Sequence, residues 1–199
     1  MAEKPLLYVT PQTRSGTVQV MDAELGGVCD YQTIDVRAGE GRSPGYLTLN
    51  PMGKVPSMTY RGVTVTEAAA ICAALADWFP EKELAPATDE PLRGAYYRWL
   101  FFSPSVIEPM MLDKLSGYDR PNATTAGHGD YARVMSAINS ALGDGPWLLG
   151  ENYSAADVVF GSTLRFATLF GAIPREGAVA DYLDRIMERP AFQKTAAGS

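Results

Sequence analysis

The sequence predicts two domains, an α/β domain over residues 4–79 and an all-α helical bundle over residues 91–199, joined by a linker at 80–90. Three observations support this prediction. In the first 79 residues, short apolar runs alternate with helical patterns, which is the order of a mixed α/β sheet. The segment that follows is charged and contains Pro80 and Pro86, a composition typical of a connection. Beyond it, the apolar residues recur at helical spacing.

Glycine positions mark two boundaries in the first domain. Gly26-Gly27 follows an apolar helical pattern and is expected to end that helix. Arg61-Gly62 separates two short apolar runs and predicts a two-residue hairpin turn. From such patterns we expect, in order, a strand at 6–9, a helix ending at Gly26, a strand at 31–36, an irregular loop with one helical turn at 38–49, strands at 57–60 and 63–65, and a helix at 67–78.

The second domain should consist of helices around one central member. Helical patterns cover residues 93–115, 131–142, 154–170 and 178–187. The segment 154–170 is apolar nearly all round, so it is expected to be the buried helix. It begins with Ser154 and Asp157 at the spacing of a capping box, which we interpret as a folding element with no catalytic role. Its loss should cost about 1–2 kcal/mol.

Composition excludes several classes of function. A net charge of −6 over 199 residues, with scattered basic residues, argues against a nucleic-acid partner. Cys29 and Cys72 are far apart and His128 is the single histidine, so neither a zinc site nor a paired-cysteine redox centre is expected. No membrane-spanning run and no signal peptide are evident at the N-terminus, and a cytoplasmic location is expected.

The stretch from Asn50 to Tyr60, followed by Glu67, predicts a binding site. If Pro56 is cis, the Val55 backbone turns outward and can pair with an extended peptide. Glu67, at the start of the next helix, adds a carboxylate beside free N–H groups and a positive dipole end. This combination suits a small peptide-like ligand that carries both an amine and a carboxylate.

These residues resemble the glutathione-binding half of the glutathione S-transferase superfamily. The resemblance continues in the segments 145–158 and 189–192, and the regions around Arg98-Trp99 and Glu108-Pro109 are similar to a bacterial branch. It implies a thioredoxin-like first domain, a helical second domain, a homodimer, no metal, and glutathione as co-substrate. The implied activity is detoxifying conjugation of the glutathione thiolate to a small hydrophobic electrophile. A non-catalytic binding module and a glutathione-dependent isomerase or reductase remain alternatives.

The resemblance assigns the ligand contacts. Val55 and Pro56 should hold the cysteinyl backbone and Glu67 the γ-glutamyl amine, while Lys54 could face the glycine carboxylate or simply be solvated. Ala68 stands where the family usually has serine, so one hydroxyl donor to the γ-glutamyl carboxylate is missing. A lost hydrogen bond to a charged group corresponds to a site weaker by about tenfold to hundredfold.

Thiol activation requires donors that favour the thiolate, because a free thiol titrates near ~8.5. The turn after the first strand offers Thr13 and Ser15, although Ser15 could equally be a helix cap. Tyr8, on that strand, is the third catalytic candidate and could instead be a packed aromatic. Arg14 stands where bacterial members of the superfamily's beta class have a cysteine. Chemistry that forms a mixed disulfide through a cysteine is therefore not expected.

The resemblance implies that the electrophile binds against the long helix of the second domain. Trp99, Phe102 and Glu108 are the candidates, with core packing as the alternative for the aromatics. Glu108 is the more specific choice, because a carboxylate in an apolar stretch needs a partner. Pro104 and Pro109 are expected to bend or interrupt this helix.

Overall fold

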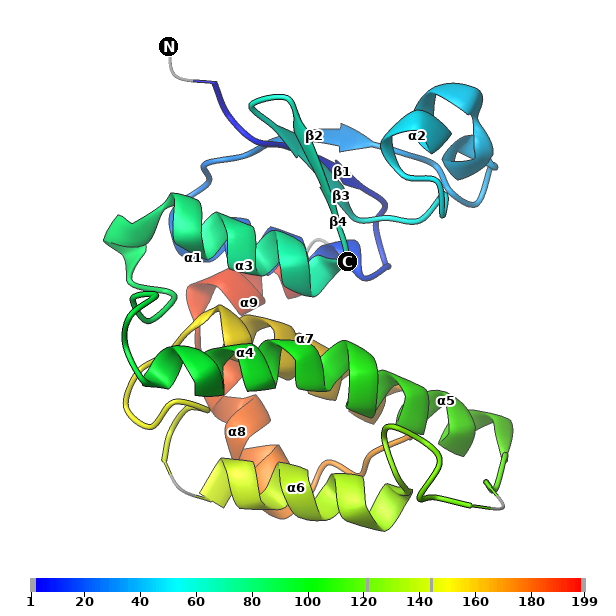
Figure 1. The fold of residues 1–199 in the computed structure, drawn as a ribbon, viewed down its shortest axis with the longest axis vertical. Helices are drawn as coiled ribbons and strands as arrows, with labels where there is room; N and C mark the ends of the chain where they lie inside the picture. Colours follow the sequence, from blue (N-terminus) through cyan, green and yellow to red (C-terminus); the bar gives the residue numbers. More distant parts are fainter. Residues whose placement is uncertain (1–2, 121, 144, 198–199) are drawn as a thin grey trace. The chain divides into compact units, whose positions relative to one another are not determined.

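A computed structural model describes residues 3–120, 122–143 and 145–197 and shows two compact units (Figure 1). The first comprises Met1–Lys82 together with Ala191–Ser199, and the second comprises Glu83–Pro190. The first unit has the thioredoxin-like α/β architecture and the second is helical, so both fold expectations are confirmed. The C-terminal helix α9 (Pro190–Ala197) groups mostly with the first unit, although its residues fall within the range 91–199 that was expected for the helical domain.

The first unit contains a four-stranded mixed sheet. Its strands are β1 (Leu6–Val9), β2 (Asp30–Thr33), β3 (Ser57–Tyr60) and β4 (Val63–Thr66), in the order β2-β1-β3-β4. β1 and β2 are parallel, and the other two pairings are antiparallel. The two-residue hairpin turn at Arg61-Gly62 is confirmed, and its φ values of 48° and 75° are the two positive angles of a type I′ turn.

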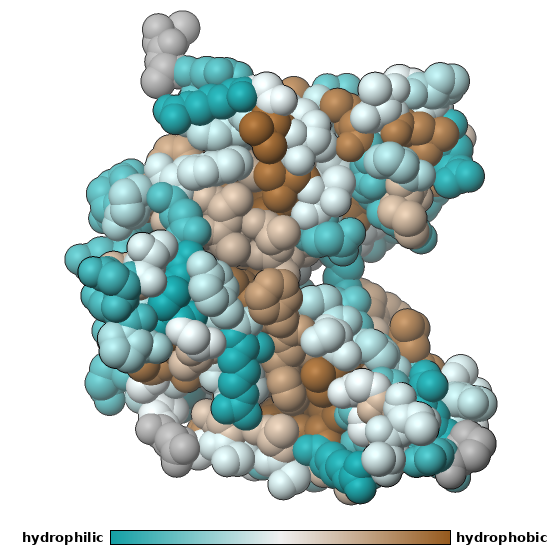
Figure 2. Space-filling view, viewed as in Figure 1, coloured by the Kyte–Doolittle hydropathy of each residue, from teal (hydrophilic) through white to brown (hydrophobic). Residues whose placement is uncertain are grey.

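Side chains along each strand alternate between the two faces of this sheet, and helices pack against them. Leu7 and Met58 pair directly and are fully buried on the face that α1 (Ser15–Leu25) and α3 (Ala68–Trp78) cover (Figure 1). Tyr8 points the opposite way and packs with Ile34 and Tyr46. Tyr46 belongs to α2 (Pro44–Leu49), over which Figure 2 shows apolar side chains reaching the surface.

Two details differ from the expected boundaries. β2 ends at Thr33, three residues earlier than predicted, because Asp35 accepts hydrogen bonds from the Arg37 and Ala38 N–H groups and turns the chain. The loop that follows is more helical than expected, with a 3₁₀ turn η1 (Glu40–Arg42) before α2. A second 3₁₀ turn, η2 (Pro80–Lys82), closes the N-terminal part of the first unit.

The second unit is built around one buried helix. Its elements are α4 (Leu92–Phe102), η3 (Ser103–Ile107), α5 (Glu108–Ser116), α6 (Tyr131–Gly143), α7 (Ala155–Leu169) and α8 (Gly177–Met187). Most of α7 is buried, and it packs against α4 and α8, so the predicted central helix is confirmed. The described part of the chain contains no helix that is long and apolar enough to cross a membrane.

The predicted interruption of the long helix is a π-helical segment. Pro104 and Pro109 are the second residues of η3 and α5, and the helical run continues through both. Proline has no N–H and its ring collides with the carbonyl four residues earlier. A local change from α to π geometry accommodates this defect without ending the helix.

Asp157 connects three parts of the second unit. It completes the predicted capping box at the start of α7: its carboxylate accepts the Ser154 N–H (3.0 Å), and Ser154 Oγ accepts the Ala156 N–H (3.2 Å). The same carboxylate also accepts the Leu148 N–H (2.9 Å) and the Tyr182 hydroxyl (3.0 Å). Burial raises the pKa of Asp157, even though these donors act in the opposite direction. Asp157 therefore completes the cap of α7 and also accepts hydrogen bonds from two other segments of the unit.

Candidate functional site

Three segments with candidate residues converge at one end of the first unit's sheet. Tyr8 on β1 pairs with Ser57 on β3, and Ser57 pairs with Thr66 on β4, so these residues form one row across the sheet. Beyond this row lie the turn 10–15 after β1, the Val55-Pro56 segment before β3, and Glu67 after β4. The register therefore brings the turn 10–15 close to two segments, Val55-Pro56 and Glu67, that follow it by 40 residues or more in the sequence.

The Val55–Pro56 peptide bond is cis, the isomer that the expected site requires. Pro56 is buried and Val55 is half-buried. In the part of the chain that the structure describes, the Val55 N–H and C=O have no hydrogen-bond partner. Because buried backbone groups are almost always paired, one free donor and one free acceptor on the same residue suit an extended ligand chain.

The peptide group before Val55 is held from the inside by residues that sequence reasoning missed. The Lys54 carbonyl accepts the Tyr46 hydroxyl (2.7 Å) and Asn50 Nδ2 (2.8 Å). Ser57 Oγ lies 3.0 Å from the Tyr46 hydroxyl and 3.3 Å from Asn50 Nδ2. Asn50 opens the same stretch that predicts the site, but nothing in its spacing indicates that its amide turns back to Lys54.

The start of α3 provides an open anion site. Ile71 is the first residue whose N–H is bonded within the helix, to the Glu67 carbonyl at 2.9 Å. The N–H groups of Ala68, Ala69 and Ala70 have no partner among the described residues. Glu67 itself is exposed and adopts φ 68°, ψ 121°, just before the first helical turn in which it was expected. A helix N-terminus with three unpaired N–H groups favours a carboxylate.

The turn after β1 is a closed network of hydroxyl groups. Thr13 Oγ1 lies 2.7 Å from the Thr10 carbonyl and 2.9 Å from Ser15 Oγ. Ser15 Oγ accepts the Thr10 N–H (3.1 Å), and Thr13 Oγ1 accepts the Ser15 N–H (3.1 Å). The Thr10 hydroxyl donates to the Ile34 carbonyl. Thr13 is half-buried and Ser15 is fully buried, so the Thr13 hydroxyl is the more accessible of the two.

The start of α1 differs from that of α3 because its N–H groups are already used. The Ser15 N–H is bonded to Thr13 Oγ1, the Gly16 N–H to the Thr13 carbonyl (3.1 Å), and the Thr17 N–H to the Arg14 carbonyl (3.2 Å). At the α1 end the backbone is therefore occupied, and side-chain hydroxyls are the donors that a ligand could reach.

Tyr8 and the electrophile candidates lie in packed surroundings. The Tyr8 ring is buried and contacts Tyr46 edge to face, with centroids 5.9 Å apart. Trp99 is buried, and its ring centroid lies 5.2 Å from that of Phe102 and 5.6 Å from that of Phe160. These contacts match the packing alternatives held for these aromatics. Phe102 and Glu108 are half-buried, and Lys54 is exposed.

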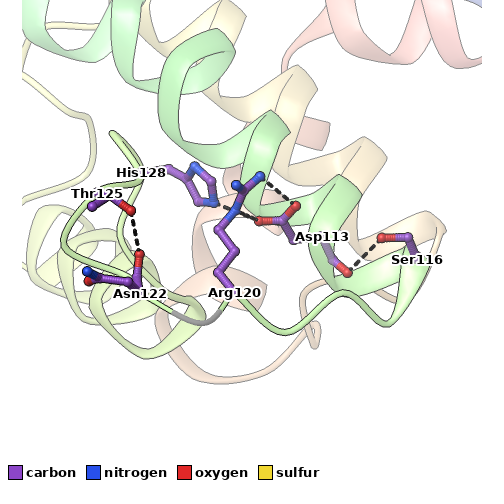
Figure 3. A network of polar contacts seen from close by, with 6 residues as sticks. All are labelled: Asp113, Ser116, Arg120, Asn122, Thr125 and His128. Carbon is purple, nitrogen blue, oxygen red and sulfur yellow. Dashed lines mark hydrogen bonds and ion pairs between the residues drawn. The ribbon is translucent and has the colours of Figure 1, made fainter.

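The single histidine belongs to a separate polar network of the second unit. Figure 3 shows Asp113 between two partners: Arg120, which bonds both carboxylate oxygens, and His128, whose Nε2 lies 2.8 Å from Oδ2. This network borders a cavity of about 330 Å³ between the end of α5 and the start of α6. None of the candidate ligand-binding residues lines this cavity.

The cysteines contribute no reactive group. Cys29 and Cys72 are buried and unpaired, and burial raises the pKa of both thiols. For Cys29 the nearby Asp22 carboxylate raises the pKa further. Within the described residues, no group of histidine, cysteine, aspartate and glutamate side chains is arranged to hold a metal ion.

Comparisons with known proteins show what the chain is similar to. The family model of the glutathione S-transferase N-terminal domain matches residues 21–78. The chain is 31% identical to a maleylacetoacetate isomerase of Pseudomonas aeruginosa, over 83% of each chain. It is 27% identical to the disulfide-bond oxidoreductase YfcG of Escherichia coli, over 92% of this chain and 88% of the relative. A Sulfitobacter glutathione transferase homologue with bound glutathione has the same fold, with a TM-score of 0.75 at 22% identity over 98% and 97% of the chains.

The extent of these matches covers both units, and the family model falls on the part of the chain that carries the cis-proline segment and the start of α3. This chain belongs to the glutathione S-transferase superfamily.

Proposed function

We propose that the protein binds glutathione and conjugates its thiolate to a small hydrophobic electrophile. The observation that carries the proposal is that two open sites lie at one end of the sheet. One is the backbone of Val55 beside cis-Pro56, whose N–H and C=O have no partner. The other is the start of α3 beside Glu67, where three N–H groups have no partner. A ligand that occupies both must combine an extended peptide backbone with an α-amino acid end, and glutathione has this constitution. The similar Sulfitobacter protein holds glutathione.

Each end of the tripeptide has a proposed contact. The cysteinyl backbone pairs with the N–H and C=O of Val55, next to Pro56. The γ-glutamyl carboxylate lies at the N–H groups of Ala68 and its neighbours, and the γ-glutamyl amine lies at Glu67. Lys54 provides a cation for the glycine carboxylate. Three backbone donors at the start of α3 reduce the effect of the missing serine hydroxyl at Ala68.

Thr13 is the proposed thiolate donor. Its hydroxyl has one proton and two acceptors in range, so it can turn from the Thr10 carbonyl to a bound sulfur. Ser15 then supports it, since the Ser15 hydroxyl can donate to Thr13 Oγ1. A hydrogen bond to the thiolate lowers the pKa of the thiol and increases the reactive fraction at neutral pH. Tyr8 and Ser15 are buried, whereas Thr13 is half-buried and so the more accessible of the three hydroxyls.

The electrophile contacts are proposed on the helical unit. Phe102 and Glu108 are half-buried on the run from α4 to α5 and combine an apolar ring with a carboxylate. Trp99 supports Phe102 through their edge-to-face contact. This arrangement suits a small, largely apolar molecule that also presents a hydrogen-bond donor.

The activation step is tested by titrating the thiol of bound glutathione through the ultraviolet absorbance of the thiolate. We expect a thiol pKa below that of free glutathione in the wild type. Thr13→Val should raise it and reduce conjugation by about 10- to 100-fold. Thr13→Ser should retain activity, and Thr59→Val on β3 is the matched control. An unshifted thiol pKa in the wild-type complex refutes activation, and unchanged rates in Thr13→Ala and Ser15→Ala refute the assignment of the donor.

Two further functions follow from specific observations. Relatives that are an isomerase and a disulfide oxidoreductase share the family, so the same glutathione site could serve an isomerase or reductase. The alanine at position 68 favours a non-catalytic binding module. Calorimetry separates the module from the enzymes that use glutathione: absence of glutathione binding at millimolar concentration excludes the enzymes, and binding without turnover of any electrophile supports the module.

A homodimer is the proposed assembly. Several large apolar side chains of the α4–α5 run are exposed in the structure, namely Tyr97, Phe101, Leu112 and Leu115. Exposed apolar area of this kind is typical of a surface that another chain covers. Light scattering coupled to size-exclusion chromatography tests this, and a mass near 21.5 kDa at micromolar concentration contradicts it.

A further inference from the structure

A buried polar cluster lies directly behind the peptide group that joins Lys54 to Val55. Its members are Tyr46, Asn50 and Ser57, which are 4%, 3% and 0% exposed. Polar side chains this deeply buried are costly unless each is hydrogen-bonded, so their partners indicate what the cluster holds.

Every donor and acceptor in the cluster can be assigned. The Tyr46 proton goes to the Lys54 carbonyl, so the Ser57 hydroxyl donates to the Tyr46 oxygen at 3.0 Å, which is closer than its other acceptor, the Lys54 carbonyl at 3.5 Å. The two protons of Asn50 Nδ2 go to the Lys54 carbonyl and to Ser57 Oγ, while Asn50 Oδ1 accepts the Met52 N–H (3.0 Å). The amide orientation follows from this pattern, because a flipped Asn50 would place its oxygen against the Lys54 carbonyl and its NH₂ group against the Met52 N–H. The Lys54 carbonyl thus receives two strong hydrogen bonds.

The geometry of the peptide group links this carbonyl to Val55. The Lys54 C=O and the Val55 N–H belong to one planar, trans peptide unit, in which they point in opposite directions. Holding the carbonyl toward Tyr46 and Asn50 therefore turns the Val55 N–H away from the cluster. Hydrogen bonds to the carbonyl also polarise the peptide group and strengthen the N–H as a donor.

We propose that Tyr46 and Asn50 are positioning residues that aim and polarise the Val55 N–H toward the cysteinyl carbonyl of glutathione. This inference rests on the proposed function, since it takes glutathione as the ligand of Val55. Neither side chain touches the ligand in this scheme, and both act through the Lys54–Val55 peptide group. Burial raises the pKa of Tyr46 above its ordinary value, so its hydroxyl remains a donor over a wider range of pH.

The variant that tests this is Tyr46→Phe, which removes one hydroxyl and keeps the ring that packs on Tyr8. Tyr60→Phe is the matched control, because Tyr60 is also buried in the same unit, at 8% exposed, and its hydroxyl donates to no described residue. Asn50→Leu removes the second donor. If that variant does not fold, Tyr46→Phe alone carries the test. Calorimetry should show glutathione binding weakened about three- to tenfold in Tyr46→Phe and unchanged in Tyr60→Phe.

A second ligand separates positioning from a general structural role. In a trans-alkene isostere of the cysteinyl-glycine amide, the carbonyl that Val55 is proposed to bind is absent. Its affinity should therefore be the same for the wild type and Tyr46→Phe. If Tyr46→Phe weakens both ligands equally, or binds glutathione as tightly as the wild type, the proposal is overturned.

A readout without ligand distinguishes failure of this inference from failure of the proposed function. In the free protein, the amide proton of Val55 should move upfield in the NMR spectrum of Tyr46→Phe, because its peptide group is less polarised. An unchanged Val55 resonance overturns the inference even if glutathione binds. Absence of glutathione binding to the wild type overturns the proposed function and, with it, the role assigned to Tyr46 and Asn50.

Discussion

Gly41 and Gly53 meet backbone to backbone, and neither leaves room for a side chain. A Cβ atom on Gly41 would lie 2.6 Å from the Gly53 carbonyl oxygen, and one on Gly53 would lie 2.6 Å from the Gly41 oxygen. Gly53 also has φ 65°, a conformation that favours glycine. This contact joins the 3₁₀ turn η1 to the residue that precedes Lys54. The loop that carries Val55 is therefore located by its glycines as well as by its hydrogen bonds.

Gly41→Ala should destabilise the protein by about 1–3 kcal/mol, because the backbone must move to accept the methyl group. It should also weaken glutathione binding, since the displaced segment leads into Val55. Gly45→Ala is the control: an added Cβ there meets nothing within 4 Å, and alanine in α2 should stabilise by about 0.5–1 kcal/mol. Urea unfolding measures both changes. Equal midpoints for Gly41→Ala and Gly45→Ala would show that the contact is unimportant.

Glu67 should show opposite effects on stability and binding. Its φ of 68° is unfavourable for a residue with a side chain, and such conformations cost on the order of 1–3 kcal/mol. Glu67→Gly relieves this strain and should raise the unfolding midpoint, while removing the carboxylate should weaken glutathione binding. Glu67→Gln keeps the strained backbone and loses only the charge, so it should bind weakly with unchanged stability. If Glu67→Gly is less stable than Glu67→Gln, the backbone at this position is not strained.

Local signals account for most of the fold that could be predicted. Gly26, the Arg61-Gly62 turn and the Ser154–Asp157 cap act within a few residues, and all three were placed correctly from sequence. The end of β2 was missed because the turn at Asp35 competes with an apolar pattern that favours a longer strand. Helix α9 carries no local sign that it belongs with the first unit, because such an assignment depends on long-range packing.

The candidate site also has a part that the sequence predicts and a part that only the folded structure shows. Val55, Pro56 and Glu67 could be located because a proline and an acidic helix start are visible in the sequence. The hydrogen bonds from Tyr46 and Asn50 to Lys54 could not, since they depend on how the loop 40–54 folds back. The same holds for the start of α1, where the Ser15, Gly16 and Thr17 N–H groups are bonded within the turn and the helix.

Asp157→Ala should cost about 3–5 kcal/mol, more than the 1–2 kcal/mol expected of a cap alone. The variant leaves the Leu148 N–H and the Tyr182 hydroxyl buried without their acceptor. Asp184→Ala is the control, because that carboxylate pairs with Arg175 at the surface and should matter by less than about 1 kcal/mol. Chemical denaturation measures the free energy of unfolding of both variants. Similar losses for the two would show that Asp157 stabilises the unit no more than a surface carboxylate does.

The raised pKa of Asp157 sets the sign of its pH dependence. The folded state binds this proton more tightly than the unfolded state, so the Asp157 contribution to stability is largest below the ordinary carboxyl pKa and falls as pH rises through the folded value. Asp157→Asn should remove this dependence. The pH profiles of unfolding for wild type and Asp157→Asn should therefore converge at low pH and separate as pH rises, and parallel profiles would contradict the assignment.

Asp113 should show the opposite sign. Its hydrogen bond with Arg120, and next that with His128, lower the pKa of the carboxyl. The contribution of these contacts is therefore present above the ordinary carboxyl pKa of about 4 and lost as pH falls through the lower folded value. Since both partners lie in the connection between α5 and α6, acidification should release that segment (Figure 3). Hydrogen exchange of amides 122–130 at neutral and acid pH measures this release.

Asp113→Asn should give fast exchange of the same amides already at neutral pH, because the neutral amide keeps the shape of the side chain and loses the charge that holds Arg120. Asp130→Asn is the matched control, since Asp130 pairs with Arg133 at an exposed position in the same region. It should leave the acid-dependent release in place. Equal exchange in wild type and Asp113→Asn at neutral pH would show that packing, and not this carboxylate, holds the connection to α5.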